Sequence, residues 1–338
     1  MNKNISFDSV SYFLMRASFI GISFKMMLLS SRQDTWISIA LAIAVGIIPL
    51  FLLKYIASYK DDLTFKEKCV SLFPKSNKLV RLVLIIGILG FCIINFGNLI
   101  NLTHNQFLDK TPHIAIAAAF IIPMILIIDK NSNVLARVTR ILIIISLALF
   151  MVSFIGLVSE FDFDNFQPVM NNSILSSSLY FLGFNVAPLF LMLTFPDKKI
   201  NWSRSYIIAT LTLLFTAIAI IGILGVELAL IYQYPEFHIL KNSFDGVISH
   251  QLVNILAIKW IIDIFILCSI CLIFCKRLSN TNKYFYPAIV LILAPFIVND
   301  YQLFNSIVFT YSMNIIPILF AAIILLFSIK IFIKKSMA

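Results

Sequence analysis

The chain has 338 residues, of which 60% are hydrophobic and only 12% are charged, and its formal net charge is +10. A soluble domain of this length has no interior large enough for so much apolar surface, so the composition indicates a polytopic membrane protein. It excludes a soluble nucleic-acid-binding protein, and we expect the cations to follow membrane topology instead. No phosphate-binding loop, catalytic triad or HExxH pattern occurs, so we expect no enzyme, cofactor or metal site.

Ten apolar segments approach or exceed the length of about 20 residues that a helix needs to cross the hydrocarbon core. They are 10–31, 35–56, 79–103, 113–128, 134–158, 173–195, 203–231, 252–275, 284–300 and 305–333. We expect one domain, residues 1–338, made of two repeats at about 10–158 and about 173–333. Five spans in each half turn the second repeat upside down, which predicts an all-α fold with a five-plus-five inverted repeat.

The basic residues predict the orientation of these spans. Twenty of the 26 lysines and arginines lie in segments that share the side of the N-terminus, against three in the opposite loops: Arg32, Lys110 and Lys241. Because cytoplasmic loops carry the excess of lysine and arginine, we expect both termini in the cytoplasm. Residues 57–78 then contain a short amphipathic helix at the inner surface, and 232–251 form an outer cap.

Two spans are interrupted at matching places. Gly21 lies in the middle of segment 10–31, and Gly183 lies in the middle of segment 173–195, with Pro188 soon after it. Where helical hydrogen bonding stops, free N–H and C=O groups need a polar partner inside the membrane. Interrupted spans at corresponding places in two halves therefore predict a ligand site. Glycine also serves close helix packing in membranes, and this alternative stays open.

The expected ligand contacts come from these two interruptions and from a polar face of the third span. They are Gly21, Ile22, Ser23, Asn95, Gly183, Phe184 and Asn185. Asn95 shares its face with Asn98 and Asn101, and these amides either contact ligand or hold helices together.

Charged side chains inside spans are costly and are retained for function or for pairing. We expect Lys25 or Lys259 to pair with Asp263 and to take the place of a bound cation, with a purely structural ion pair as the alternative. Lys259 precedes Asp263 by one helical turn, so both lie on one face. Arg16 lies nearer the cytoplasmic end, and we expect its side chain to reach the membrane surface.

Several short motifs follow one another along the chain. Gln33-Asp34-Thr35-Trp36 opens the second span, Leu72-Phe73-Pro74-Lys75 lies in the first inner loop, Phe163-Asp164-Asn165-Phe166-Gln167-Pro168-Val169 precedes the sixth span, and Lys259-Trp260-Ile261-Ile262 lies in the eighth. In these motifs the chain resembles the GerAB-type spore germination permeases, which are the B subunits of germinant receptors in the amino acid–polyamine–organocation superfamily.

The resemblance implies a LeuT-type fold with broken first and sixth helices. It also implies partnership with an A subunit and a lipoprotein C subunit, and sensing of a small germinant, an amino acid or similar, at the inner spore membrane. The chain departs from the family at Asn95, Gly97 and Asn101, where relatives carry charged residues, and at Asn185, where an acidic residue is common. The alternatives are an ion-coupled amino acid permease and a structural receptor subunit that has lost ligand binding.

Overall fold

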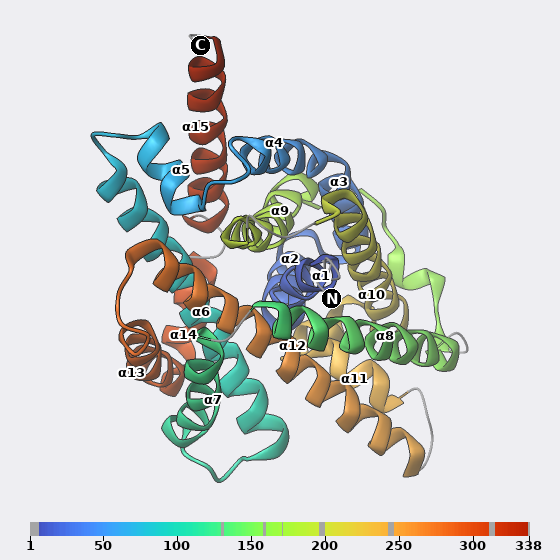
Figure 1. Cartoon of the computed structure of the whole chain (residues 1–338). Helices are drawn as coiled ribbons and strands as arrows, with labels where there is room; N and C mark the ends of the chain where they lie inside the picture. Colours follow the sequence, from blue (N-terminus) through green and yellow to red (C-terminus); the bar gives the residue numbers. More distant parts are fainter. Residues whose placement is uncertain are drawn as a thin grey trace.

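The computed structural model describes residues 7–129, 132–157, 160–170, 172–195, 200–242, 247–310 and 315–336, and every regular element within them is helical (Figure 1). Six stretches are long and apolar enough to cross a membrane: Phe24–Ser58, Asn77–Phe107, Ile174–Thr194, Trp202–Ile231, Ala257–Ser279 and Ile316–Ser336. His113–Ile128 and Phe285–Asn299 are shorter apolar helices. This architecture is that of an integral membrane protein.

The first half of the chain follows the predicted spans closely. The first span consists of α1 (Asp8–Ala17), a π-helical turn η1 (Phe19–Ser23) and α2 (Phe24–Ser31). After the turn η2 (Arg32–Asp34), the second span is divided into α3 (Thr35–Val45) and α4 (Ile47–Ser58). The remaining helices are α5 (Phe65–Leu72), α6 (Asn77–Phe107), α7 (His113–Ile128) and α8 (Ser132–Leu157).

The second half begins with the turn η4 (Phe163–Phe166), α9 (Ile174–Leu191) and the turn η5 (Met192–Thr194). It continues with α10 (Trp202–Ile231), α11 (Pro235–Asn242), α12 (Val247–Ser279) and α13 (Phe285–Asn299). The tenth predicted span, 305–333, is described as two helices, α14 (Tyr301–Thr310) and α15 (Ile316–Ser336). The inverted repeat itself stays a prediction.

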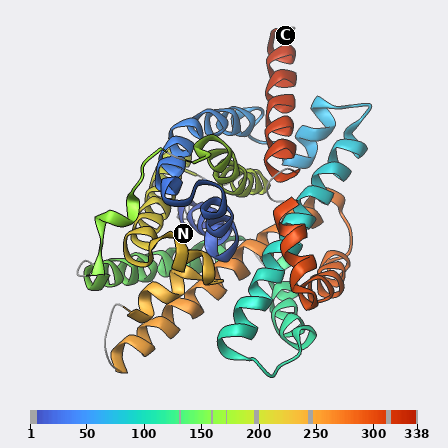
Figure 2. The same cartoon turned by 180° about the vertical axis from the view of Figure 1, so that it is seen from behind.

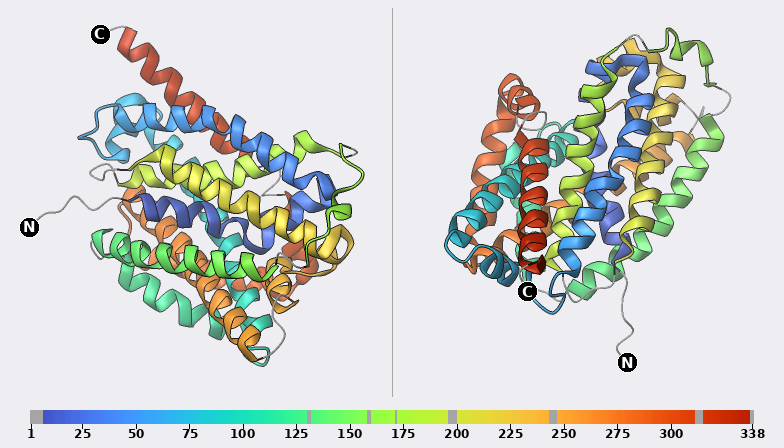
Figure 3. Two further views of the ribbon diagram at one scale, coloured as in Figure 1. Left: turned by 90° about the vertical axis from the view of Figure 1, so that its right-hand side faces the viewer. Right: turned by 90° about the horizontal axis from the view of Figure 1, so that it is seen from above.

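The interrupted first span lies at the centre of the molecule. In Figure 1, α1 and α2 are enclosed by α8, α9, α10 and α12, all of which contact α1. Figure 2 shows α6, α7, α13 and α14 gathered beside this group, and α12 joins the two groups by its long contact with α6. Helix α15 leans on α4 and α9, and its C-terminal part extends beyond the other helices (Figure 3).

Helix α5 is the amphipathic helix expected in the first inner loop. A capping box starts it, because the Glu67 carboxylate accepts from the backbone N–H of Thr64 at 2.8 Å. Phe65 and Cys69 are buried as the pattern predicts, but Lys68 is buried too. Its Nζ donates to the carbonyl oxygen of Ala57 at 2.7 Å, in the last turn of α4, where a cation stabilises the helix terminus. Burial lowers the pKa of Lys68.

The connecting segments expected on the inner side meet one another at one end of the molecule. Their contacts are Lys54 with Ser203, Arg81 with the Leu278 carbonyl, Arg277 with the Thr194 carbonyl, Lys334 with the Ser71 carbonyl, and Lys276 and Lys283 with Asp129. These contacts bring five separate stretches of the chain together at one end, as an alternating topology requires: 54–81, 129, 194–203, 276–283 and 334.

The segments expected outside meet at the opposite end. Contacts there join Arg32 with Glu227, His113 with Asn299, and Asn105 with Gln233. Asp34 is fully buried, and its carboxylate accepts from the backbone N–H groups of Met170 at 2.8 Å and Asn172 at 3.1 Å. The two halves of the chain are therefore fastened together at this end by a buried carboxylate.

Helix α10 contains an interruption that the sequence pattern did not predict. Gly225 has φ 65° and ψ 173°, a conformation that residues with a Cβ rarely adopt. The loop before α9 binds next to it, because the carbonyl oxygen of Gly222 accepts from the Asp162 N–H at 2.8 Å and from Asn165 Nδ2 at 2.9 Å. The freed carbonyl is thereby satisfied inside the protein.

Candidate functional site

The break in the first span is centred on Gly21. This residue has φ +68° within the π-helical turn, and a Cβ there would lie 2.4 Å from the Cε1 atom of Tyr234. Both the backbone conformation and the close approach of the ring require glycine. The interruption frees the Gly21 N–H from helical hydrogen bonding, so this group must find an acceptor elsewhere.

The acceptor comes from the segment between α10 and α11, far away in the sequence. The Gly21 N–H donates to Glu236 Oε1 at 3.2 Å. In the same segment, the Tyr234 hydroxyl donates to Asn98 Oδ1 at 3.3 Å, and Lys25 Nζ donates to the carbonyl oxygen of Tyr232 at 3.2 Å. The predicted outer cap therefore reaches inward and covers the break.

Helix α9 contacts the same region, but it is not broken as expected. It runs as an α-helix through Gly183, whose missing Cβ would lie 2.3 Å from Cγ of Pro317, so this glycine serves close packing against α15. Pro188 lacks the N–H that would bond to the carbonyl of Phe184, four residues earlier. The Ser18 hydroxyl donates to that carbonyl at 2.8 Å, which satisfies α9 without a break.

Buried polar atoms without a hydrogen-bond partner lie at the break and in α6 beside it. Among the described residues they include Ser23 Oγ, Asn95 Oδ1 and Glu236 Oε2. Water does not reach these side chains freely, since Ser23 is only 1% exposed and Glu236 only 5% exposed. Asn95 uses only its Nδ2, which donates to the carbonyl of Phe91 at 2.8 Å. Such atoms cost free energy in an apolar interior unless a ligand or water meets them.

The predicted intramembrane charges form a buried group next to this site. Lys259 and Asp263 form an ion pair within α12, and Asp263 Oδ1 has no hydrogen-bond partner among the described residues. Lys25 instead donates to the carbonyl oxygen of Tyr232. Arg16 does not reach the membrane surface as expected: it is 7% exposed, donates to Ser146 Oγ at 2.7 Å, and interacts electrostatically with Asp263 and Glu236.

Glu236 is the site residue that the sequence pattern missed, because it looked like one more acidic residue in an outer loop. Burial raises the pKa of its carboxyl to about 7, while hydrogen bonds from the backbone N–H groups of Glu236 itself and of Gly21, and the charges of Lys25 and Arg16, oppose this rise. The one local signal in the sequence is its place directly after Tyr234-Pro235, at the start of a short helix. Nothing in that signal points to Gly21.

Ile22 and Asn185 belong to described helices, but their side chains lie outside the described part of the structure. Phe184 is buried and meets the first span through its backbone carbonyl. Of the expected contacts, the structure thus brings Ser23 and Gly21 to the break and the Phe184 carbonyl close to it. Gly183 faces α15 instead.

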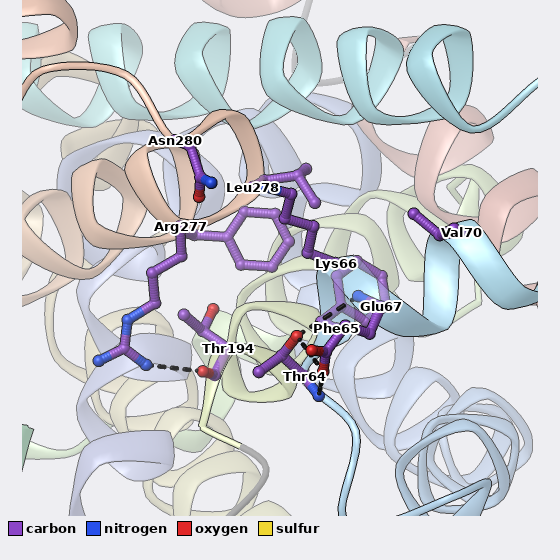
Figure 4. A pocket seen from close by; sticks show the side chains of 10 residues that line it. Thr64, Phe65, Lys66, Glu67, Val70, Thr194, Arg277, Leu278 and Asn280 are labelled. Carbon is purple, nitrogen blue, oxygen red and sulfur yellow. Dashed lines mark hydrogen bonds between the residues drawn. The ribbon is translucent and has the colours of Figure 1, made fainter.

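Two larger cavities lie at the two ends of the molecule. The inner one has a volume of about 680 Å³ and is lined by α5 and the end of α12; Figure 4 shows Arg277 bonded to the Thr194 carbonyl on its wall. The outer one, of about 440 Å³, is lined by Arg32, Asn165 and Glu227 among others. Neither of these two cavities is lined by Gly21, Ser23 or Glu236.

Comparison with known proteins identifies one family. A family model described as spore germination protein, the spore permease family, matches residues 8–285. This range contains the break, α11 and the ion pair of α12. No curated protein matches the chain.

Proposed function

Since this chain belongs to the spore permease family of spore germination proteins, we propose that it senses a small-molecule germinant as the membrane subunit of a germinant receptor. The observation that carries the proposal is the break at Gly21 inside a membrane span, beside buried polar atoms that have no hydrogen-bond partner among the described residues. A small polar molecule, an amino acid or similar, would supply the missing partners.

The ion pair of α12 favours sensing over ion-coupled transport. Lys259 already pairs with Asp263 inside the membrane, which leaves this carboxylate without an unpaired negative charge that could hold a transported cation. We further propose that the subunit lies in the inner spore membrane with both termini in the cytoplasm. It would work with an A subunit and a lipoprotein C subunit, to which it passes the signal of an occupied site.

Gly21→Ala tests whether the break is the sensing site. The new Cβ meets the Tyr234 ring at 2.4 Å and requires a strained φ, so the cap is pushed away from the break. We expect spores that carry this variant to lose germination in response to amino acids, nucleosides and sugars to the same degree as spores without the gene. The amount of protein in the membrane should stay near the wild-type amount.

Gly87→Ala in α6 is the matched control. Its Cβ meets the side chain of Leu319, closest at the tip atom Cδ2, which can move aside, and germination should be unchanged. Normal germination of the Gly21→Ala spores would contradict the proposed site. Uptake of a labelled germinant into vesicles that contain the purified protein would favour the permease alternative.

A further inference from the structure

The carboxylate of Glu236 occupies the break from within the protein. It comes from the first turn of α11, and it accepts the hydrogen bond of the Gly21 N–H that a ligand would otherwise receive. Three positive groups favour an anion at this place. They are the freed N–H itself and the side chains of Arg16 and Lys25, which both interact electrostatically with Glu236.

Few interactions keep the Glu236 carboxylate at the break. The carboxylate interacts with the backbone N–H of Gly21, at 3.2 Å, and with the backbone N–H of Glu236 itself, whereas Oε2 has no hydrogen-bond partner among the described residues. A buried carboxylate is stable when it accepts several hydrogen bonds or a close cation. Here no salt bridge between Glu236 and a lysine or arginine forms within the described part of the chain. Burial accordingly raises its pKa to about 7.

We propose that Glu236 is an internal stand-in for a ligand's carboxylate, and that a carboxylate-bearing ligand binds at the break by displacing it and releasing α11. This inference rests on the proposed function and names the class of germinant: a small molecule with a free carboxylate. The carboxylate of the ligand would accept the hydrogen bond of the Gly21 N–H and lie near the positive charges of Arg16 and Lys25. It would also contact the Ser23 hydroxyl, which has no hydrogen-bond partner among the described residues.

Displacement of Glu236 would carry the signal through α11. The same segment holds Tyr234 against Gly21 and places the Tyr232 carbonyl on Lys25. One residue after Glu236, the ring of Phe237 lies 6.3 Å from that of Trp260, which directly follows Lys259 in α12. A shift of α11 would therefore reach the helix that carries the buried ion pair.

Binding to the purified full-length chain in lipid nanodiscs tests the proposal. The probes are the proteinogenic amino acids, each beside its C-terminal amide, which lacks the carboxylate. In Glu236→Gln and Glu236→Ala the internal competitor is weakened or removed. We expect amino acids that bind to the wild type to bind about tenfold more tightly to both variants, because a hydrogen bond to a charged group no longer has to be broken. Binding of the amides should not tighten.

Glu160→Gln is the control, since Glu160 is an exposed acidic residue of the outer side and its substitution should leave affinity unchanged. Weaker or unchanged amino acid binding by the Glu236 variants would overturn the proposal. Weaker binding would mean that Glu236 holds the ammonium group of the ligand, and the proposed function would stand. If neither the wild type nor the variants bind any probe, the proposed sensing of amino acids fails together with this inference.

A second measurement tests, in the absence of a ligand, whether Glu236 keeps α11 in place. Gln233 is half-buried next to Tyr234, and the five native cysteines are buried, so Gln233→Cys provides a reporter with little background. We expect a maleimide to label this cysteine several times faster when Glu236→Ala is added, with the melting temperature of the protein kept. Equal labelling rates would show that Glu236 does not hold α11, which would overturn the release step.

Discussion

Asp34 is the residue whose buried charge ties the outer loops to the second span. Its carboxylate is fully buried and accepts from the backbone N–H groups of Met170 and Asn172 and from Asn172 Nδ2. The neighbouring Gln33 donates to the Pro168 carbonyl at 2.6 Å, and Trp36 contacts the ring of Phe166. The motifs around Gln33-Asp34 and before α9 thus belong to one structural contact.

Asp34→Ala should therefore destabilise the protein without touching the break. Three hydrogen bonds to the buried carboxylate are lost, which we expect to cost about 3 kcal/mol in total. The measurement is the melting temperature of the purified protein in detergent, which should fall by several degrees. Asp164→Ala, an exposed carboxylate in the partner loop, should leave the melting temperature unchanged. Equal melting temperatures of the two variants would refute the structural role of Asp34.

The ion pair of Lys259 and Asp263 offers a test that separates function from stability. Asp263→Asn leaves Lys259 buried without a counter-charge, at a cost of about 3–5 kcal/mol, and we expect germination to be lost while the protein stays in the membrane. The double variant Lys259→Met/Asp263→Leu replaces the pair by apolar side chains and should recover the melting temperature. If it also recovers germination, the pair is purely structural.

At the scale of helices, the interruption at Gly21 was predictable and the one at Gly225 was not. Gly21 lies in a span with two internal cations, which marks it as unusual. Gly225 and Gly183 look alike in the sequence, as glycines in apolar helices, yet one is a break and the other a packing contact. The difference depends on neighbours from elsewhere in the chain: Asn165 beside Gly225, and Pro317 against Gly183.

The position of α11 likewise depends on residues that are far away in the sequence. Pro235 and the polar composition of 232–251 were sufficient to predict a cap between two spans. Its depth was not predictable, because the contact between Glu236 and Gly21 joins residues 215 positions apart. The local pattern also placed Arg16 at the membrane surface, whereas the hydroxyl groups of Tyr12 and Ser146 satisfy its guanidinium inside the bundle. A partner from another helix, here Ser146 of α8, is not visible in the local pattern.

At the scale of the whole molecule, the contacts divide the connecting segments into two ends that agree with the charge bias. The basic segments meet around Asp129, Thr194 and Ser203, and the acidic loops meet around Asp34 and Glu227. Since the excess of lysine and arginine belongs to the cytoplasmic side, the end that contains α5 and the last turn of α15 should face the cytoplasm.

Cysteine labelling in intact cells that express the protein checks this orientation. Lys75 and Asp162 are exposed at the two ends, and the native cysteines are all buried, so single cysteines can be introduced without removing others. A membrane-impermeant maleimide should label Asp162→Cys in intact cells, and Lys75→Cys only after the membrane is permeabilised. The opposite pattern would invert the topology and place the Glu236 cap on the cytoplasmic side, where a germinant from outside could not reach it first. Labelling of both positions in intact cells would mean that the two ends do not lie on opposite sides of the membrane.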